Sequence, residues 1–547
     1  MMTLRSSAAR SGPMPRSTRC RCSIARVLLS CGLIAGLSVP LAIQAAKAPV
    51  QGLAGEQIYS RGISPSGEPM TAFVGAGAAE LPASALPCGS CHGPDGRGRP
   101  EGGVTPSDIT WNHLTKSYGH RHDYGRDHPA FDEASVIAAI TGGVDPAGNR
   151  LDSVMPRYSM SAEDVHALLG YLKQLEHESD AGLTDDSIHL ATLLPLSGPA
   201  APLGQALSAV TTAIVADLNA AGGLHGRRIE LQVLPLGDTR AEALIHLEQA
   251  IARDEIFALL GSYSVGFEED LYTLVEREGV PLIGPLSPQA PANSALSRYT
   301  FQLFASREQQ ARILVDYAAE RTENAGANVM VAGASTGEGN ALAAAIDEQG
   351  RAYGWPALQS FNYEPGALDA ERLAAALRDS DAQQLFFFGS AAELSAALDA
   401  AARAGQAPAV FLLADAVTPA LFEAPAAFDG RIFAAYPSLP GDVTAKGRAE
   451  FGALMEKHGL SNDYLSVQVA AYAAGAVLSE ALKRAGRDLS RERLISALES
   501  LHRFETGVTP PLTFTLNEHV GASGAHLVQL EFGAQRYTPV GTWRDLD

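Results

Sequence analysis

The chain has 547 residues and a mass of 57.3 kDa, with 46% hydrophobic and 19% charged residues. This length and balance predict a globular protein of several domains, and they exclude a disordered or polytopic membrane chain. The formal net charge is −20. A charge of this sign repels a phosphate backbone, so we expect no nucleic-acid partner.

Residues 1–46 are typical of an export signal. Six arginines and no Asp or Glu precede an apolar run at 27–46, which ends in the small residues Ala45 and Ala46. We therefore expect a signal peptide and a mature protein in the periplasm. Two alternatives stay open. The run is long enough for an uncleaved membrane anchor, and Cys31 lies in a weak lipoprotein-like context.

Only Cys88 and Cys91 follow that segment, and they stand in Cys-Gly-Ser-Cys-His, which ends at His92. Cys-x-x-Cys-His is the pattern of c-type haem attachment. Two thioether bonds to neighbouring vinyl groups need cysteines one helical turn apart, and the next residue then directs its imidazole at the iron. The pattern predicts one covalently attached haem c. A disulfide or a structural zinc site is the weaker alternative, because no second cysteine pair exists.

A second axial ligand is predicted from the pair Met155-Pro156. It precedes a segment with a capping signal at Ser161 and leucines at helical spacing. Met160 is the rival ligand, but it stands where that helix begins. Imidazole and thioether ligation raises the reduction potential and fills both axial positions, which favours electron transfer over oxygen or peroxide chemistry.

Together these features resemble a class I cytochrome c over residues 52–178. The resemblance implies a small all-α domain with an N-terminal helix near 55–59, a Met-Pro loop and a closing helix. It also implies that His92 is the proximal ligand of the haem iron and Met155 the distal one.

An insertion at 118–128 departs from a minimal cytochrome. Its three histidines, His120, His122 and His128, are candidates for a metal site, but a charged insertion of this kind is more often a solvated loop or a neighbour of the haem propionates. Arg121 and Arg126 are candidate propionate partners.

A short acidic linker, residues 179–186, follows the cytochrome-like segment. Beyond it, apolar runs alternate with helical stretches, which predicts an α/β fold of two doubly wound, Rossmann-like lobes over residues 187–547. The predicted strands are 188–194, 229–234, 257–261, 281–286, 329–333, 385–389 and 410–414. The predicted helices are 205–220, 240–253, 308–321, 341–350, 370–379 and 391–404.

Four local sequences recur in a recognisable order: Leu-Pro-Leu-Ser-Gly-Pro at 194–199, Asp-Leu-Asn-Ala-Ala-Gly-Gly at 217–223, Gly-Ser-Tyr-Ser at 261–264 and Gly-Val-Pro-Leu-Ile-Gly-Pro at 279–285. Taken together they resemble the type I periplasmic binding proteins of the branched-chain amino acid (Leu/Ile/Val) receptor family. The resemblance implies a solute cleft between two lobes that close like a hinge. Three crossovers are expected, near 304–306, 435–438 and 512–515.

The same resemblance implies a ligand grip. Hydroxyl-bearing loops after two strands hold the ligand carboxylate, and an acid in the second lobe meets the ammonium group; here the acid is Asp415 and the loop residues are Ser262, Tyr263, Ser264 and Ser287. A small, amino-acid-like solute is the expected ligand. The alternative is that Ser264 and Asp415 only satisfy backbone groups at strand ends.

No catalytic constellation stands out, so we do not expect an enzyme: a Walker motif is absent, and residues 333–339 lack the Rossmann spacing. Two functions remain. The favoured one is a periplasmic electron carrier that serves a redox partner, either a terminal cytochrome or a dehydrogenase such as the quinoprotein alcohol dehydrogenases that relatives often accompany. The alternative is a solute receptor for the permease of an ABC importer or for a sensor, with an accessory haem domain.

Overall fold

The computed structural model describes most of the chain from residue 50 onward. The described residues are 50–98, 103–122, 125–175, 180–237, 239–253, 255–287, 297–321 and 328–546. The predicted export segment and part of the predicted domain boundary, residues 176–179, lie outside them.

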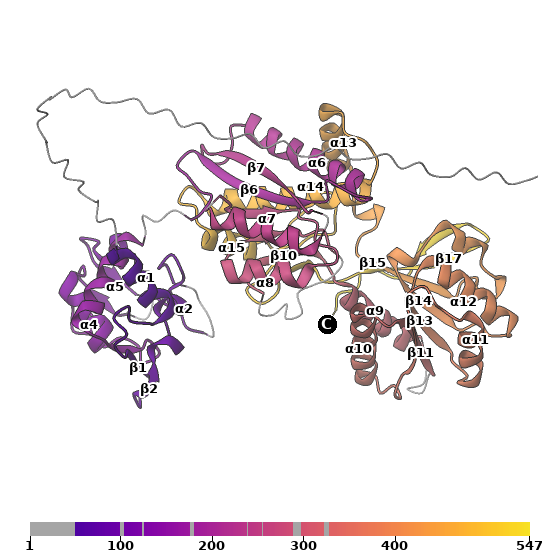
Figure 1. The fold of residues 1–547 in the computed structure, drawn as a ribbon, viewed down its shortest axis with the longest axis horizontal. Coiled ribbons are helices and arrows are strands. Elements are labelled where there is room, and N and C mark those ends of the chain that lie inside the picture. Colours follow the sequence, from indigo (N-terminus) through magenta and orange to yellow (C-terminus); the bar gives the residue numbers. More distant parts are fainter. Residues whose placement is uncertain are drawn as a thin grey trace, which may run out of the picture. The chain divides into compact units, whose positions relative to one another are not determined.

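The cytochrome-like segment folds into helices around a small apolar core (Figure 1). The closing helix begins where the sequence predicts, because the Ser161 hydroxyl caps it by accepting a hydrogen bond from the Asp164 amide at 3.1 Å. Ile58, Tyr59 and Leu168 are among the buried core residues. The helices are α1 (Val50–Arg61), α2 (Cys88–His92), α3 (Trp111–Leu114), α4 (Glu133–Gly142) and α5 (Ala162–Gln174).

Helices α1 and α5 cross at a point where only glycine fits. A Cβ atom on Gly55 would lie 2.3 Å from the carbonyl oxygen of Ala167 and 2.5 Å from the Cβ of Tyr171. Next to this crossing, the rings of Tyr59 and Tyr171 pack with centroids 5.4 Å apart. The crossing therefore ties the start of the segment to its end and encloses the residues between them.

Short strands accompany the helices, which the sequence did not predict. β1 (Thr71–Val74) lies between β2 (Ala79–Pro82) and β5 (Arg157–Ser159), and both pairs are antiparallel. β3 (His120–Arg121) and β4 (Asp127–His128) form a hairpin in the histidine-rich insertion. Since β5 directly follows Met155 and Pro156, its pairing with β1 fixes one end of the Met-Pro loop.

Lobe 1 contains a sheet with the strand order β16-β10-β9-β8-β6-β7, and its two faces are covered by different helices. Alternate residues of β6 point to opposite faces, so Leu190 packs with α6 and α14 while Leu193 packs with α7 and α8. The strands are β6 (Ser187–Leu194), β7 (Arg228–Pro235), β8 (Ala258–Leu260), β9 (Leu282–Ile283), β10 (Thr300–Phe304) and β16 (Val520–Ala522). The helices are α6 (Ala201–Ala220), α7 (Arg240–Ala252), α8 (Glu268–Glu278), α13 (Ala445–His458), α14 (Leu465–Ala485) and α15 (Arg491–Glu499).

Lobe 2 has the strand order β12-β11-β13-β14-β15-β17-β18, parallel up to β15 and antiparallel beyond it. One apolar cluster packs α11 and α12 on one face, and another packs α9 and α10 on the other. The strands are β11 (Val329–Ala334), β12 (Gln359–Tyr363), β13 (Gln384–Phe388), β14 (Ala409–Leu413), β15 (Ile432–Tyr436), β17 (His526–Glu531) and β18 (Arg536–Pro539). The helices are α9 (Arg307–Glu320), α10 (Gly337–Ala352), α11 (Ala370–Asp379) and α12 (Ala391–Arg403).

Two of the three crossovers lie where the sequence predicts, and the third does not. The chain passes from lobe 1 to lobe 2 after β10 and returns after β15. The third passage runs between β16 and β17, at residues 523–525, so the prediction at 512–515 is wrong. Leu512 and Phe514, which lie in the predicted crossover, are instead buried in the core of lobe 1.

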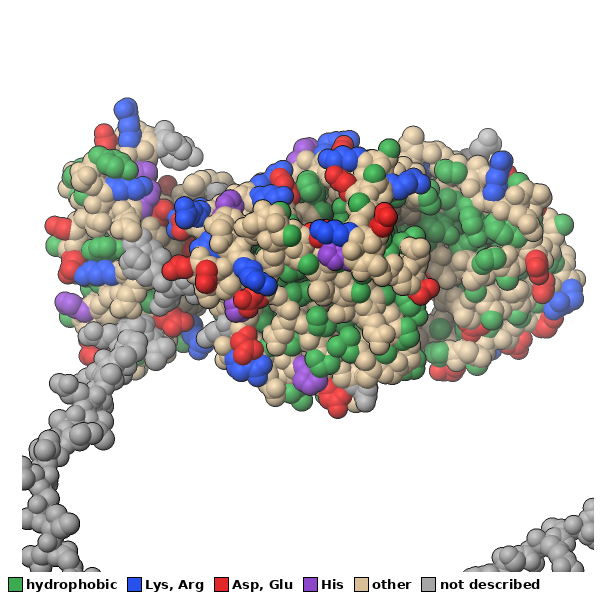
Figure 2. Space-filling view, turned by 90° about the horizontal axis from the view of Figure 1, so that it is seen from above, with side chains coloured by type: hydrophobic (Ala, Val, Ile, Leu, Met, Phe, Trp, Pro, Cys, Tyr) green, Lys and Arg blue, Asp and Glu red, His purple; other side chains and the backbone are tan. Residues whose placement is uncertain are grey.

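Helices α6 and α14 are each long and apolar enough to cross a membrane by length and composition alone. Both contribute buried side chains to the core of lobe 1, which accounts for their apolar character. On the face shown in Figure 2, acidic and basic side chains are interspersed over the surface.

Candidate functional site

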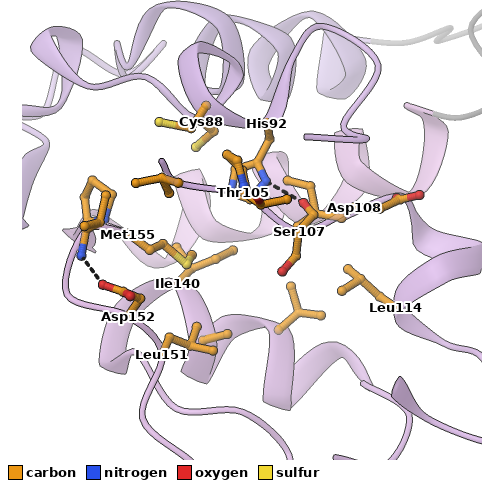
Figure 3. A pocket seen from close by; sticks show the side chains of 18 of the residues that line it. Cys88, His92, Thr105, Ser107, Asp108, Leu114, Ile140, Leu151, Asp152 and Met155 are labelled. Atoms are coloured by element: carbon orange, nitrogen blue, oxygen red, sulfur yellow. Dashed lines mark hydrogen bonds between the residues drawn. The ribbon is translucent and has the colours of Figure 1, made fainter. Parts of the chain in front are cut away.

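A cavity of about 570 Å³ opens in the cytochrome-like segment, within the size range of about 300–1,000 Å³ that is typical of ligand sites. Cys88, Cys91 and His92, all on α2, line it together with Met155. Figure 3 shows Cys88 and His92 on one wall and Met155 beside Ile140 on the wall across from them. The structure thus brings together all four residues that the sequence predicted for the haem.

His92 is held in the tautomer that an iron ligand needs. Its Nδ1 lies 2.9 Å from the carbonyl oxygen of Ser107, which only accepts hydrogen bonds, so Nδ1 carries the proton and Nε2 keeps its lone pair (Figure 3). Burial lowers the pKa of His92, while Ser107 and the charge of Asp108 partly offset that effect. The imidazole is therefore neutral at neutral pH.

Cys88 and Cys91 lie one turn apart on α2, which begins directly after Pro87. Pro87 is the N-cap residue of α2, and its extended backbone, with φ of −66° and ψ of 152°, marks the start of the helix. Burial raises the pKa of the Cys88 thiol to about 12. A thioether at this position carries no charge at any pH, so covalent attachment is compatible with the buried surroundings.

Most of the cavity wall is apolar, as a porphyrin requires. A flat macrocycle has apolar faces and carries its charge on two propionates, so it fits a cavity with an apolar interior and a few polar groups. Tyr158, at the Cys88 side, donates its hydroxyl hydrogen to the Leu86 carbonyl at 2.5 Å and presents its ring to the cavity. The apolar lining includes Leu86, Ile109, Leu114, Phe131, Val136, Ile140, Leu168 and Leu172.

The two candidate distal ligands differ in their surroundings. Met155 lines the cavity, whereas Met160 packs against the apolar core of the segment and is not among the described residues that line the cavity. This placement agrees with the argument that Met160 belongs to the start of the closing helix. The donor set that fits an iron porphyrin is therefore His92 with Met155.

The histidine-rich insertion also faces this cavity. His113, His120, His122 and His128 all line it, with Nε2 of His122 3.1 Å from Nε2 of His128 and the rings of His113 and His120 4.9 Å apart. Since His128 is only 8% exposed, the expectation of a solvated loop is wrong for that residue. Among the described residues, no group of three or more His, Cys, Asp or Glu side chains is arranged to hold a metal ion.

Arg126 and Arg121 differ as candidate propionate partners. Arg126 lines the cavity, but its guanidinium already forms an ion pair with the buried Asp145 at 3.1 Å. Burial alone would raise the pKa of Asp145, and hydrogen bonds from Asn149, the Ala147 amide and Arg126 lower it overall. Arg121 is exposed and does not line the cavity. Arg126 is thus the better placed of the two.

In lobe 1, two of the residues predicted to hold the solute, Ser262 and Ser287, already form hydrogen bonds within the protein. The Ser262 hydroxyl is buried and accepts a hydrogen bond from the Leu193 amide at 3.2 Å, and Ser264 is fully buried, while Tyr263 is half-buried. Ser287 donates to Glu268 at 2.9 Å.

Glu268 is a residue that the sequence analysis missed. It is 6% exposed, and its second carboxylate oxygen accepts from the Gly266 amide at 2.9 Å. The Glu268 carboxylate therefore already accepts hydrogen bonds from the Ser287 hydroxyl and the Gly266 amide, in the region predicted to hold the carboxylate of a solute. Its position in the first turn of α8, where acidic residues are favoured, is the signal that could have pointed to it.

In lobe 2 the predicted ammonium ligand is also paired. Asp415 forms an ion pair with Arg307, whose Nε lies 2.7 Å from the Glu338 carboxylate. The Asp415 side chain is 58% exposed, so a solute can still reach it. Arg307 opens α9 directly after the first crossover, and sequence reasoning gave it no role.

Residues 333–337 read Gly-Ala-Ser-Thr-Gly, which is the spacing of a nucleophile elbow, and they form the turn between β11 and α10. The Ser335 amide donates to the Tyr363 carbonyl at 2.7 Å, and Thr336 caps α10 by accepting from the Gly339 amide at 3.0 Å. In the part of the chain that the structure describes, no histidine is hydrogen-bonded to Ser335. We read this turn as a helix cap.

The fold and the cavity define a two-lobed α/β binding protein of type I that is preceded by a c-type cytochrome. The profile of the periplasmic binding protein family matches residues 187–535, and that of cytochrome c matches residues 83–176. The first match covers more than half of the chain, so the protein belongs to the periplasmic binding protein family, and it carries a cytochrome c domain in front of its binding-protein lobes.

A relative supports the same assignment. Leu/Ile/Val-binding protein homolog 3 of Brucella melitensis biotype 1 is 24% identical over 213 residues, which make up 38% of this chain and 55% of that protein. The chain thus spans only about half the length of this relative.

Solved structures share the fold of the lobes. A fatty acid ABC transporter substrate-binding protein from Thermomonospora curvata is 18% identical with a TM-score of 0.52, over 68% of this chain and 95% of its own. A branched chain amino acid ABC transporter from Thermus thermophilus with bound valine is 20% identical with a TM-score of 0.52, over 67% and 97%. The two names refer to a fatty acid and to valine, so this fold does not determine the solute.

Proposed function

We propose that the protein is a periplasmic electron carrier with a single haem c, joined through thioethers to Cys88 and Cys91 and ligated by His92 and Met155. The observation that carries this proposal is the cavity in which these four residues meet, with His92 and Met155 on facing walls. The cytochrome c family match over the same residues supports it.

The cavity residues suit electron transfer better than a reaction at the iron. When bound, the haem supplies an iron that accepts and releases one electron. The chain's part would be to supply the imidazole of His92 and the thioether of Met155 as iron ligands, which would leave no ligand position for oxygen or peroxide. The apolar walls exclude water and favour the less charged, reduced state. For these reasons we assign no catalytic residue.

The proposed arrangement of the mature chain is a cytochrome c domain at 52–178, a linker at 179–186 and a solute-binding domain at 187–547, released from a signal peptide at 1–46. The periplasmic family match supports an exported protein. In this arrangement the binding-protein lobes dock the cytochrome to a redox partner or tune it through a bound solute. The proposed partner is a periplasmic dehydrogenase, such as a quinoprotein alcohol dehydrogenase, and a terminal cytochrome is the other candidate.

A second function, solute receptor for an ABC importer or a sensor, is favoured by the lobes themselves. They account for residues 187–535 in the family match and contain both sheets of the type I fold. The proposed solute is a small, amino-acid-like molecule that reaches Tyr263, Ser287 and Asp415. Glu268 and Arg307 already engage Ser287 and Asp415, so a solute has to compete with them for these two residues.

One experiment separates the two functions. The purified, haem-loaded protein is mixed with a quinoprotein alcohol dehydrogenase and its alcohol, and the haem absorbance is followed; in parallel, thermal unfolding is measured with branched-chain amino acids. Fast haem reduction without solute stabilisation supports the carrier and contradicts the receptor. Stabilisation by a solute with a haem that the dehydrogenase does not reduce contradicts the carrier. If the purified protein contains no haem, the proposal of an electron carrier is contradicted.

A further inference from the structure

The side chain of Arg157 turns back onto the loop that carries Met155. Its Nη2 donates hydrogen bonds to the carbonyl oxygens of Leu151 at 2.8 Å and Asp152 at 3.0 Å, and its Nη1 donates to the carbonyl of Met155. One guanidinium thus binds both ends of residues 151–155. A charged donor makes stronger hydrogen bonds than a neutral one, and only arginine offers several donors in a fixed plane.

Gly143 provides the space for this guanidinium. It ends α4 in the left-handed conformation, with φ of 67°. A Cβ atom there would lie 1.6 Å from Nε of Arg157 and 2.3 Å from its Cζ, so no other residue fits without moving the arginine. The Gly143 carbonyl also accepts a hydrogen bond from the Leu151 amide at 2.9 Å. The same glycine therefore anchors the loop and its clamp to α4.

The small sheet holds the arginine from the other side. Arg157 pairs with Phe73 in the antiparallel register of β1 and β5, and the Gly75 amide donates to the Ser153 carbonyl at 2.9 Å. The backbone of Arg157 is thus fixed by a strand while its side chain reaches the loop. The loop is held at the strand and at α4, and Arg157 is the link between the two.

We propose that Arg157 is a positioning residue that keeps the Met155 thioether at the iron, and that Gly143 provides the space for its guanidinium. This inference rests on the proposed haem ligation by Met155. A thioether is a weak, neutral ligand, so its occupancy depends on how firmly the protein holds its loop. A loop that opens more often leaves the sixth position to competing ligands.

The test uses the haem-loaded, full-length protein. Arg157→Gln removes the charge, Arg157→Lys keeps the charge but replaces the planar guanidinium fork with a single nitrogen, and Gly143→Ala displaces the guanidinium while leaving Arg157 in place. Arg61→Gln, at the exposed end of α1, is the matched control. Two readouts are taken: the long-wavelength ferric absorption band that marks a thioether on the iron, and the imidazole concentration that displaces it. Thermal unfolding is recorded for every variant.

We expect Arg157→Gln and Gly143→Ala to lower the half-displacing imidazole concentration by about tenfold or more, the size expected for losing about one charged hydrogen bond. Arg157→Lys should fall between these variants and the wild type, and Arg61→Gln should equal the wild type. If Gly143→Ala does not fold, the two Arg157 variants carry the test.

Three outcomes would overturn the inference. Arg157→Gln with the wild-type imidazole response shows that the clamp does not hold the ligand. A loss of thermal stability that is equal in Arg157→Gln and Arg157→Lys, without a graded change in imidazole response, shows a merely structural role. A wild-type protein that contains haem but lacks the thioether band contradicts ligation by Met155 itself, and is thereby distinguished from a failure of Arg157 alone.

Discussion

The haem cavity and the solute grip of the lobes differ in how directly the sequence reveals them. In the cytochrome domain, Cys88, Cys91, His92 and Met155 line one cavity, and the Ser107 carbonyl holds the His92 imidazole through Nδ1. In the lobes, two of the predicted grip residues already have partners, Ser287 with Glu268 and Asp415 with Arg307. A covalent cofactor requires a fixed local spacing, whereas a solute grip depends on side chains from distant loops that also bind one another.

The largest expected effect comes from removing the covalent attachment. Replacing both Cys88 and Cys91 with alanine leaves no sulfur for a thioether, so the denatured protein should carry no haem mass at all. The domain should also lose stability, because α2 and its neighbours then surround an empty cavity. Mass spectrometry under denaturing conditions and visible absorbance measure the result.

Ser262→Ala in lobe 1 is the control for this variant and should keep its haem. The lobes of the double variant should keep their own unfolding transition, since each has its own apolar clusters. Haem mass that survives in the double variant would contradict attachment at α2.

The second effect concerns the distal ligand. Met155→Ala should lower the reduction potential, because the thioether favours the reduced iron, and should open the iron to added imidazole or cyanide. Potentiometric titration and absorbance measure both changes. Met160→Ala is the matched control, since Met160 packs in the core and should affect stability without changing the potential. An unchanged potential in Met155→Ala together with a lowered one in Met160→Ala would reverse the assignment.

The third effect is a pH dependence of the cytochrome domain. Burial, with the charges of Arg126, His120 and His128, lowers the pKa of His122 from 6.5 to about 4, and the charge of Asp145 partly opposes this. Between about pH 6.5 and 4 the unfolded chain therefore binds more protons at this site than the folded one, so stability falls as the pH falls through this window. Because His122 is only partly buried, we expect about 1 kcal/mol or less.

The measurement is the unfolding temperature of the haem domain between pH 4 and 7. His122→Gln should flatten the pH dependence without changing the temperature at pH 7 much. If the unfolding temperature of His122→Gln depends on pH as strongly as that of the wild type, the titrating group is another of the four histidines that line the cavity.

Much of the fold was predictable because its signals are local. The capping signal at Ser161 and the alternation of strands and helices in the lobes predict elements within a few residues of their bounds. The residues that we propose as haem ligands stand out in the sequence for the same reason, and the structure brings them to one cavity. The pairing of β1 with β5 was not, because it joins residues more than 80 apart in the chain and has no turn signal of its own.

The error in the third crossover and the unpredicted partners of the grip residues have a different cause. The run around Leu512 and Phe514 is apolar enough for a crossover strand, but tertiary packing places both side chains in the core of lobe 1. Arg307 and Glu268 lie at helix starts, where charged residues are common, so nothing in the sequence marks them as partners of Asp415 and Ser287. Pairs of this kind become visible only once the loops are folded.

The smallest expected effect tests whether the paired grip of lobe 2 limits solute binding. Arg307→Gln breaks the ion pairs with Asp415 and Glu338, and because Asp415 is 58% exposed the cost in stability should be about 1 kcal/mol or less. The freed carboxylate can then meet the ammonium group of a solute. We expect branched-chain amino acids to raise the unfolding temperature more in Arg307→Gln than in the wild type, as measured by calorimetry at equal solute concentration.

The control is Arg403→Gln, which removes an exposed ion pair with Glu371 elsewhere in lobe 2. An equal response in Arg307→Gln and wild type would mean that Arg307 does not compete with the solute, and the contrast between the two regions would then rest on Glu268 alone.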